Sequence, residues 1–226
     1  MFVHVPSRRK PRPAIATYFL VALSIAMFVA WWGQSPEART RWLHLLGVLP
    51  GDWVAIASQG SKVFVLHVVR LATALFVHAD GLHLIGNLVF LLVFGASAEK
   101  PLGAPRLIAL FLLCGMAANL VGALWFPAQS APIIGSSGAV SALVGAYATL
   151  FPRSRLGLML PLGAFFEFVR MPAYGLIGLW VLVQVLMFVL TPGGSPIAWP
   201  VHLAGFACGV GYALLSRDAI ARRLRN

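Results

Sequence analysis

Four long stretches without Asp, Glu, Lys or Arg constrain the fold of this chain more than any other feature. They cover residues 13–36, 81–98, 107–152 and 171–216, and they are 24, 18, 46 and 46 residues long. The hydrocarbon core of a bilayer is about 30 Å thick and needs roughly 20 apolar residues when crossed as a helix. Each of the first two stretches is therefore long enough for one membrane span, and each 46-residue stretch for two, if a turn divides it.

Both longer stretches contain such a turn, one at 125–132 and the other at 191–196, and both turns are rich in Pro or Gly. Clusters of Pro and Gly end helices. We therefore predict an all-α, polytopic membrane protein with six transmembrane helices. The predicted spans are about 14–32, 81–98, 106–125, 136–151, 173–190 and 201–216. They form one membrane domain over 14–216. A basic N-terminal tail at 1–13 precedes it, and a basic C-terminal tail at 217–226 follows it.

The composition supports this class, because 60% of the residues are hydrophobic and only 10% are charged. Soluble domains carry about 25% charged residues, and disordered chains have low hydrophobicity. A soluble enzyme and a disordered chain are therefore both excluded. The net charge of +11 would favour a nucleic-acid partner only if it formed a basic patch on a soluble face.

The basic residues instead fall between the spans. With the amino terminus in the cytoplasm, 13 of the 17 Lys and Arg residues lie in cytoplasmic segments: Arg8, Arg9, Lys10, Arg12, Lys100, Arg106, Arg153, Arg155, Arg170, Arg217, Arg222, Arg223 and Arg225. The other four lie in the first outer loop: Arg39, Arg41, Lys62 and Arg70. This bias follows the positive-inside rule. We expect both termini in the cytoplasm, a lipid bilayer as partner, and no nucleic acid.

The first outer loop, about 33–80, is too long for a simple turn. Its apolar runs at 53–57 and 63–66 are too short to span, so we expect an interfacial or re-entrant segment. The first span begins like a signal peptide, but Trp31 and Trp32 stand where cleavage needs small residues, so we expect a retained anchor.

A few polar residues interrupt the spans, and such residues are functional candidates because a membrane interior disfavours them. His83 and Asn87 lie in the second span, Ser137 and Ser141 in the fourth, and His202 in the sixth. These three spans all enter from the outer side, so a histidine, a serine and a histidine lie at similar depth. Two further amides, of Asn119 and Gln184, have the character of interhelical hydrogen-bond groups.

Helical spacing adds to this convergence. Ser137 shares a face with Gly145, and His202 shares a face with Gly205 and Gly209. Small residues let membrane helices approach closely. We therefore expect the fourth and sixth spans to bring Ser137 and His202 within hydrogen-bond reach.

These residue types suit acyl transfer. A serine hydroxyl needs an adjacent base, and the oxyanion intermediate needs preorganised donors. His83, Asn87 and the Ser137 backbone amide at a helix N-terminus are candidate donors. No carboxylate lies within the spans to complete a catalytic triad, and Asp80, the nearest candidate in sequence, lies at the membrane edge. A Ser–His dyad is therefore favoured over a triad. No metal or cofactor is implied.

Three motifs resemble those of the rhomboid intramembrane serine proteases. The GSSG sequence at 135–138 is similar to the GxSG motif of that family, and HLIGN at 83–87 is similar to its HxxxN motif. HLAG at 202–205, followed by Gly209, resembles its catalytic-histidine helix. The resemblance covers about 60–216 and implies a rhomboid-like bundle with a long interfacial first outer loop.

The resemblance also implies residue roles. It makes Ser137 the nucleophile, His202 the general base, and His83 and Asn87 part of an oxyanion hole beside the Ser137 amide. It gives the fifth span and the loop at 191–200 the role of a gate above a water-filled cavity. It suggests substrate or gate contacts at Gly135, Gly138, Trp180 and Gln184.

Two positions depart from the family pattern. Val69 precedes Arg70 where a Trp-Arg pair is common, which leaves the anchoring of the first outer loop to be explained. Ser141 stands where some members have a tyrosine that stacks on the catalytic histidine, so the support of His202 must differ.

The expected activity is cleavage of single-span membrane proteins near the outer end of their transmembrane segments. The six-span form suggests a bacterial inner membrane. Three alternatives remain open. One is a metal site built from His78, Asp80, His83 and His202, although no HExxH helix is present. The second is a transporter or channel, although no internal repeat is evident. The third is a catalytically silent relative that binds membrane helices.

Overall fold

The structure is a computed structural model that describes residues 13–55, 60–162, 165–191 and 198–225. Its elements, in chain order, are α1 (Ile15–Trp32), α2 (Pro36–Leu46), α3 (Pro50–Ala55), α4 (Gly60–Thr73), η2 (Ala74–Phe76), α5 (Gly81–Phe90), η3 (Leu91–Gly95), α6 (Ala96–Leu102), α7 (Ala104–Trp125), α8 (Ser137–Leu150), β1 (Arg155–Leu162), β2 (Phe165–Pro172), α9 (Ala173–Leu190), α10 (Trp199–Leu215) and α11 (Arg217–Arg225). The basic tail at 1–12 and most of the loop at 191–200 lie outside the described residues.

Each of the six predicted ranges contains a helix. The second range is filled by α5, η3 and α6, which together form one apolar helix, Gly81–Leu102. That helix, α1, α7 and α9 are long and apolar enough to cross a membrane, whereas α8 and α10 are shorter apolar helices. The prediction of a polytopic helical membrane protein is confirmed, and the assignment of each span to the bilayer stays a prediction.

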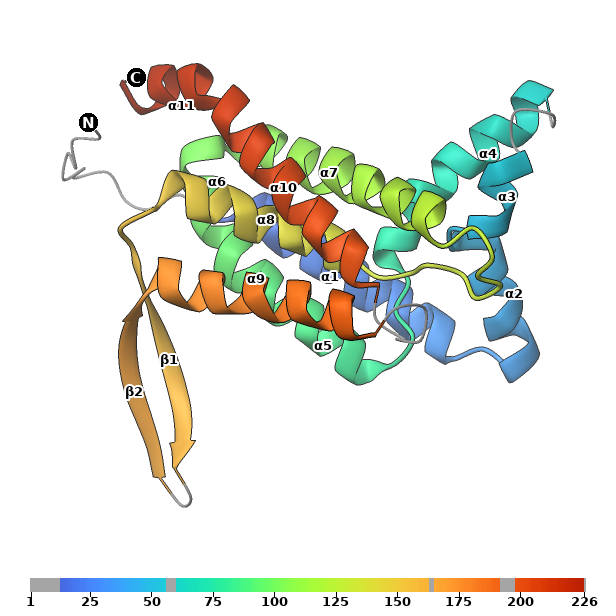
Figure 1. The fold of residues 1–226 in the computed structure, drawn as a ribbon, viewed down its shortest axis with the longest axis horizontal. Helices are drawn as coiled ribbons and strands as arrows, with labels where there is room; N and C mark the ends of the chain where they lie inside the picture. Colours follow the sequence, from blue (N-terminus) through green and yellow to red (C-terminus); the bar gives the residue numbers. More distant parts are fainter. Residues whose placement is uncertain (1–12, 56–59, 163–164, 192–197, 226) are drawn as a thin grey trace.

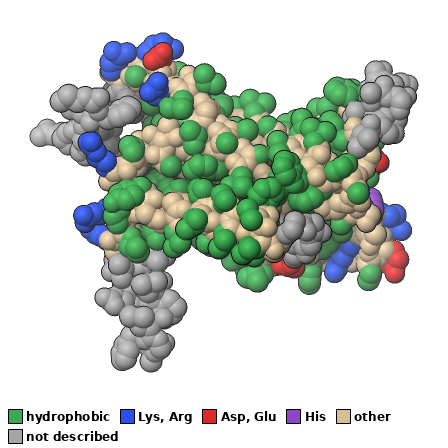
Figure 2. Space-filling model, viewed as in Figure 1, with side chains coloured by type: hydrophobic (Ala, Val, Ile, Leu, Met, Phe, Trp, Pro, Cys, Tyr) green, Lys and Arg blue, Asp and Glu red, His purple; other side chains and the backbone are tan. Residues whose placement is uncertain are grey.

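The elements are distributed between two ends of the molecule. Helices α6 and α11 and the β1–β2 hairpin lie at one end, and α2, α3 and α4 lie at the other (Figure 1). On the face drawn in Figure 2, hydrophobic side chains cover the middle, and the Lys and Arg side chains gather toward the two ends. This is the surface pattern that a bilayer requires of a protein embedded in it.

Helix α8 forms the centre of the bundle, and every residue from Gly138 to Tyr147 is buried. Its backbone lies directly against α10, because a Cβ atom at Gly205 would overlap the Gly138 carbonyl group and one at Gly209 would overlap the Ala142 carbonyl group. The two small-residue faces noted in the sequence therefore do pack against each other. Close helix approach through glycine is a common way to gain packing in membranes.

The start of α1 is fixed by a carboxylate from a distant part of the chain. Glu99, in α6, accepts hydrogen bonds at 2.9 Å from the backbone amides of Ala16 and Thr17 and at 2.8 Å from the Thr17 hydroxyl. The N-cap residue Ala14 makes no side-chain capping bond. The buried Glu99 thus satisfies amides that an N-cap side chain otherwise satisfies.

A β-hairpin connects α8 to α9, where the sequence led us to expect only a cytoplasmic loop. Strands β1 and β2 are antiparallel, with Arg155 opposite Pro172 and Leu162 opposite Phe165. The hairpin points away from the helical body (Figure 1). It is an addition to the predicted all-α architecture and does not alter the order of the helices.

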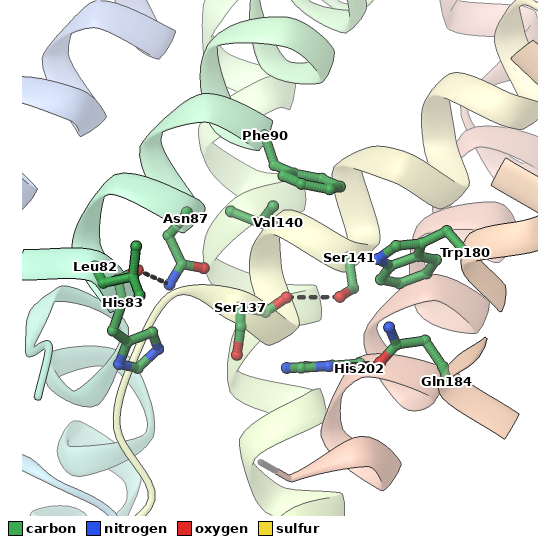
Figure 3. A pocket seen from close by; sticks show the side chains of 11 residues that line it. Leu82, His83, Asn87, Phe90, Ser137, Val140, Ser141, Trp180, Gln184 and His202 are labelled. Carbon is green, nitrogen blue, oxygen red and sulfur yellow. Dashed lines mark hydrogen bonds between the residues drawn. The ribbon is translucent and has the colours of Figure 1, made fainter. Parts of the chain in front are cut away.

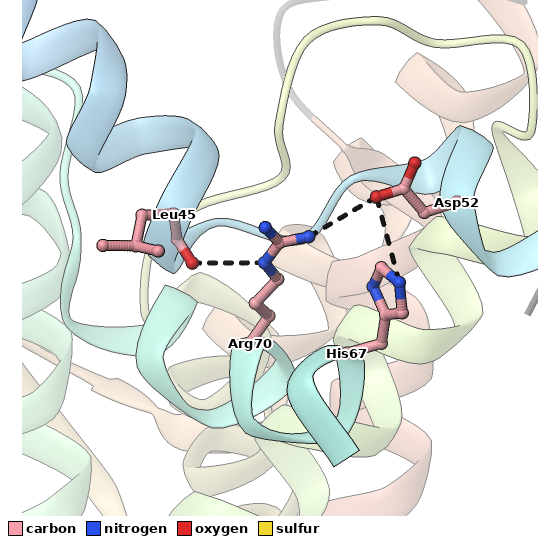
Figure 4. A network of polar contacts seen from close by, with 4 residues as sticks. All are labelled: Leu45, Asp52, His67 and Arg70. Atoms are coloured by element: carbon pink, nitrogen blue, oxygen red, sulfur yellow. Dashed lines mark hydrogen bonds and ion pairs between the residues drawn. The ribbon is translucent and has the colours of Figure 1, made fainter. Parts of the chain in front are cut away.

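Within its described residues, the first outer loop contains the helices α2, α3 and α4, which Arg70 ties together (Figure 4). The Arg70 Nε group donates to the Leu45 carbonyl at 3.1 Å, and the Thr73 hydroxyl donates to the Leu46 carbonyl at 2.7 Å. Both acceptors belong to the last turn of α2, whose carbonyls lack intrahelical partners. Anchoring thus comes from Arg70, while the neighbouring Val69 is exposed.

The same arginine contacts α3, since its Nη1 atom lies 3.4 Å from Asp52 Oδ2. His67 Nε2 lies 4.0 Å from the same carboxylate oxygen. Burial lowers the pKa of His67 below its ordinary value, against a smaller opposing effect of Asp52, which favours the neutral ring. Arg70 is therefore the cation that pairs with Asp52. The interfacial location of these helices stays a prediction.

Candidate active site

A cavity of about 230 Å³ opens between α5, α8, α9 and α10. Polar groups from all four helices line it, and apolar side chains complete the wall. The lining residues are Leu82, His83, Gly86, Asn87, Phe90, Ser137, Val140, Ser141, Trp180, Gln184 and His202 (Figure 3). All four residues expected to carry the chemistry are therefore in one place, although they come from three separate helices.

The loop before α8 places Ser137 at the first residue of that helix. Gly135 has a φ of 105°, a conformation that favours glycine, and its amide donates to the Ala74 carbonyl at 2.8 Å. A Cβ atom at Gly135 would lie 2.7 Å from His83 Nε2. Glycine is therefore needed here for the turn and also for the close approach of the His83 ring.

Ser137 and His202 lie next to each other in the cavity (Figure 3). Figure 3 draws no hydrogen bond between the Ser137 hydroxyl and the His202 ring. Catalytic hydrogen bonds are often long in structures without substrate, so proximity is the relevant observation. The Ser141 hydroxyl donates to the Ser137 carbonyl at 2.7 Å and so lies one helical turn deeper along α8.

The His202 ring is held from two other sides. Its Nδ1 atom lies 2.8 Å from the Gln184 side-chain oxygen, on α9. Trp199 meets the ring edge to face, with centroids 6.0 Å apart and planes at 90°. These two contacts hold the His202 ring, which in this chain has no stacking tyrosine because position 141 is a serine.

His83 and Asn87 are positioned by the first turns of α5. Asp80 caps this helix by accepting the His83 amide at 2.8 Å, so its carboxylate has a structural partner. The Ala79 amide donates to His83 Nδ1 at 3.4 Å, an orientation that assigns the ring proton to Nε2. Asn87 uses one amide hydrogen on the His83 carbonyl at 2.9 Å and has a second one to donate.

His78 lies behind this site and does not line the cavity. It is buried, its Nε2 atom lies 3.3 Å from the Ser136 hydroxyl, and its ring packs edge-on against His83. Within the described part of the chain, no three side chains of His, Cys, Asp or Glu come together as a metal site. The alternative metal site from His78, Asp80, His83 and His202 is therefore not assembled.

The remaining expected site residues divide into two pairs. Trp180 and Gln184 line the cavity, whereas Gly135 and Gly138 do not. Gly138 packs against Ala118 of α7 and Val201 of α10, so both glycines shape the backbone around the site. Trp199 was not among the expected site residues, although its position three residues before His202 places it on the same side of α10.

Comparisons with known proteins agree with this architecture. Residues 66–218, more than half of the chain, match the family model described as the Rhomboid domain. The chain is 29% identical over 188 residues to "Rhomboid protein 1, mitochondrial" of Saccharomyces cerevisiae, which covers 79% of this chain and 50% of that protein. It is 25% identical over 210 residues to "Rhomboid-related protein 2" of Mus musculus, covering 87% of this chain and 62% of that protein.

A further relative is "Inactive rhomboid protein 1" of Drosophila melanogaster, 27% identical over 141 residues, which are 62% of this chain and 9% of that protein. The chain thus spans half to somewhat under two thirds of the length of the yeast and mouse relatives. With a matching domain over most of its length and a helical bundle of the expected kind, the chain belongs to the rhomboid family.

Proposed function

We propose that this protein is an intramembrane serine endopeptidase that hydrolyses peptide bonds in or near transmembrane segments. The observation that carries the proposal is the single cavity in which Ser137, His202, His83 and Asn87 meet. Ser137 serves as nucleophile, His202 as base, and His83 and Asn87 as oxyanion donors, and the four come from three separate helices.

In the first step the Ser137 hydroxyl attacks the carbonyl carbon of the scissile peptide, and His202 takes the hydroxyl proton. The same proton then passes from His202 to the leaving amine when the C–N bond breaks. A water molecule attacks the resulting acyl-enzyme with His202 again as base, which releases the acid product and restores Ser137.

The attack by Ser137 and the later attack by water each form an oxyanion, and three donors suit it. The Ser137 backbone amide lies in the first turn of α8, where helix amides lack intrahelical partners. The Nε2–H of His83 and the second amide hydrogen of Asn87 come from α5. Donors preorganised in a site shielded from water are the usual main source of rate enhancement.

The expected substrates are transmembrane segments of single-span membrane proteins, in a multi-pass protein with both termini in the cytoplasm. The bias of Lys and Arg toward the α6 and α11 end supports this orientation, and a bacterial inner membrane is the proposed location. Substrate helices need small or helix-weakening residues near the cleavage site, because hydrolysis requires an accessible backbone. No cofactor is part of the proposal.

The deciding experiment compares the wild type with Ser137→Ala in liposomes, using a fluorogenic transmembrane substrate. We expect cleavage by the wild type and none by Ser137→Ala or His202→Ala. Asn87→Ala is expected to retain activity lowered by about 10²–10³-fold, the usual effect of losing one oxyanion donor. The matched control is Ser136→Ala, which removes the neighbouring hydroxyl outside the cavity and should keep most of the activity.

Equal cleavage by wild type and Ser137→Ala would exclude this mechanism, and inhibition by a zinc chelator would restore the metal alternative. A wild type that binds transmembrane peptides without cleaving them would identify the chain as a silent, helix-binding member. The similarity to an inactive rhomboid of Drosophila makes that outcome the one to test first.

A further inference from the structure

We propose that Gln184 of α9 is a positioning residue that holds His202 in the tautomer able to act as base toward Ser137. The inference rests on the proposed protease function and assigns a task to a residue outside the dyad and the oxyanion hole. Its starting point is the 2.8 Å contact between His202 Nδ1 and Gln184 Oε1.

The direction of this hydrogen bond decides the chemistry. A neutral histidine has one N–H donor and one acceptor nitrogen, and the partner of one nitrogen fixes the state of the other. With the Gln184 oxygen as acceptor, Nδ1 carries the proton and Nε2 keeps its lone pair. The edge of the ring away from Gln184 faces Ser137 (Figure 3), so the free nitrogen is available for the hydroxyl proton.

The opposite orientation of the amide has the opposite result. A Gln184 –NH₂ group turned toward His202 would donate to Nδ1 and place the ring proton on Nε2. That ring would offer Ser137 a donor and no base. The orientation of the amide is therefore a property that an experiment on the His202 tautomer can decide directly.

The described part of the cavity wall offers no carboxylate as a competing acceptor, since its titratable side chains are His83 and His202. Asp80 is used as the cap of α5, and Glu99 is used as the cap of α1. Gln184 thus occupies the place that the aspartate takes in a Ser–His–Asp triad, with a neutral amide instead of a charge.

The burial of Gln184 means that its side-chain amide needs a hydrogen-bond partner. Gln184 is 6% exposed, and the buried residues of this helix are Ala173, Ile177 and Gln184. A buried amide is unfavourable unless it is hydrogen-bonded. The contact with His202 satisfies the buried Gln184 oxygen and gives the His202 Nδ1 atom its acceptor.

The test uses two nearly isosteric replacements in the full-length protein. Gln184→Met removes the acceptor, and Gln184→Glu keeps an acceptor oxygen. Asn119→Leu is the matched control, because Asn119 is another buried amide of a long helix, bonded to the Leu71 carbonyl at 3.0 Å and outside the cavity. The readouts are kcat and KM, the rate of Ser137 labelling by a fluorophosphonate, and the ¹⁵N NMR tautomer of His202 in a Ser137→Ala background.

We expect Gln184→Met to lower kcat and the labelling rate by roughly 10–100-fold, the effect typical of losing a partner that orients a functional histidine, with little change in KM. Gln184→Glu should restore most of the rate, and Asn119→Leu should leave it unchanged. The His202 signal should report Nδ1–H with Gln184 present and a mixture of tautomers with methionine.

Wild-type labelling by Gln184→Met, or an equal loss in Asn119→Leu, would overturn the inference while leaving the protease proposal intact. If the wild type neither cleaves nor reacts, the protease proposal fails, and the tautomer measurement still decides this one. An Nε2–H signal for His202 beside Gln184 would refute the positioning role in either case.

Discussion

Helices α8 and α9 carry Ser137 and Gln184, which lie on two sides of His202, but the two helices have very different environments. Helix α8 carries Ser137, and its residues from Gly138 to Tyr147 are all buried. Helix α9 carries Gln184, and most of its large apolar side chains, such as Leu179, Leu182 and Leu186, are exposed.

The difference shows that two kinds of force hold the site. Helix α8 is fixed by protein packing on every side. We expect the exposed face of α9 to meet lipid, which is as apolar as leucine and therefore gives little drive for the helix to dock. The contacts that hold α9 to the bundle include the Gln184–His202 bond and the ring contacts of Trp180 with Phe206 and of Phe188 with Trp125.

The largest expected contrast comes from one truncation made on each helix. Leu143 of α8 is fully buried, so Leu143→Ala should lower the free energy of unfolding by about 2–5 kcal/mol. Leu182 of α9 is 60% exposed, so Leu182→Ala should change it by less than about 0.5 kcal/mol. Unfolding by SDS in mixed micelles measures both, and equal losses would show that α9 is packed as firmly as α8.

An intermediate effect is expected where α10 touches α8. A Cβ atom at Gly209 would overlap the backbone of Ala142, so Gly209→Ala should destabilise the fold by about 1–3 kcal/mol. Nothing lies within 4 Å of a Cβ atom built at Gly211 of the same helix, which makes Gly211→Ala the control. Thermal unfolding of the two variants in detergent compares them, and a harmless Gly209→Ala would contradict the close α8–α10 contact.

The smallest effect is expected on α9 and has the opposite sign. Nothing lies within 4 Å of a Cβ atom built at Gly178, so Gly178→Ala should stabilise the protein by up to about 1 kcal/mol through helix propensity. SDS unfolding again provides the measurement. A loss of stability would reveal a contact of α9 that this structure does not contain.

The positions of the helices could be read from the sequence because charge is excluded from apolar spans. The ranges predicted from the stretches without charged residues agree with the ends of α1, α7 and α9 to within a few residues. The β1–β2 hairpin was missed although Leu156, Leu158, Leu160 and Leu162 recur at every second position, which is the period of a strand. The three-helix fold of the first outer loop was missed because its ties are single hydrogen bonds from Arg70 and Thr73.

The sequence was enough to predict which residues belong to the candidate site, but not which of their side chains contact each other. Ser137, His202, His83 and Asn87 stand out as polar groups at one depth, and the structure places them around one cavity. The partner of Gln184 depends on the rotation of α9 about its axis and on its crossing with α10. Neither quantity is encoded in spacing along one helix, so the contact with His202 appeared only in three dimensions.

The Glu99 carboxylate has a consequence for how this bundle joins to other sequence. Because it satisfies the first amides of α1 from within the bundle, the helix start does not depend on a capping side chain from the residues before it. We therefore expect changes in the residues before Pro13 to leave the first turn of α1 intact, because its Ala16 and Thr17 amides keep their acceptor on α6.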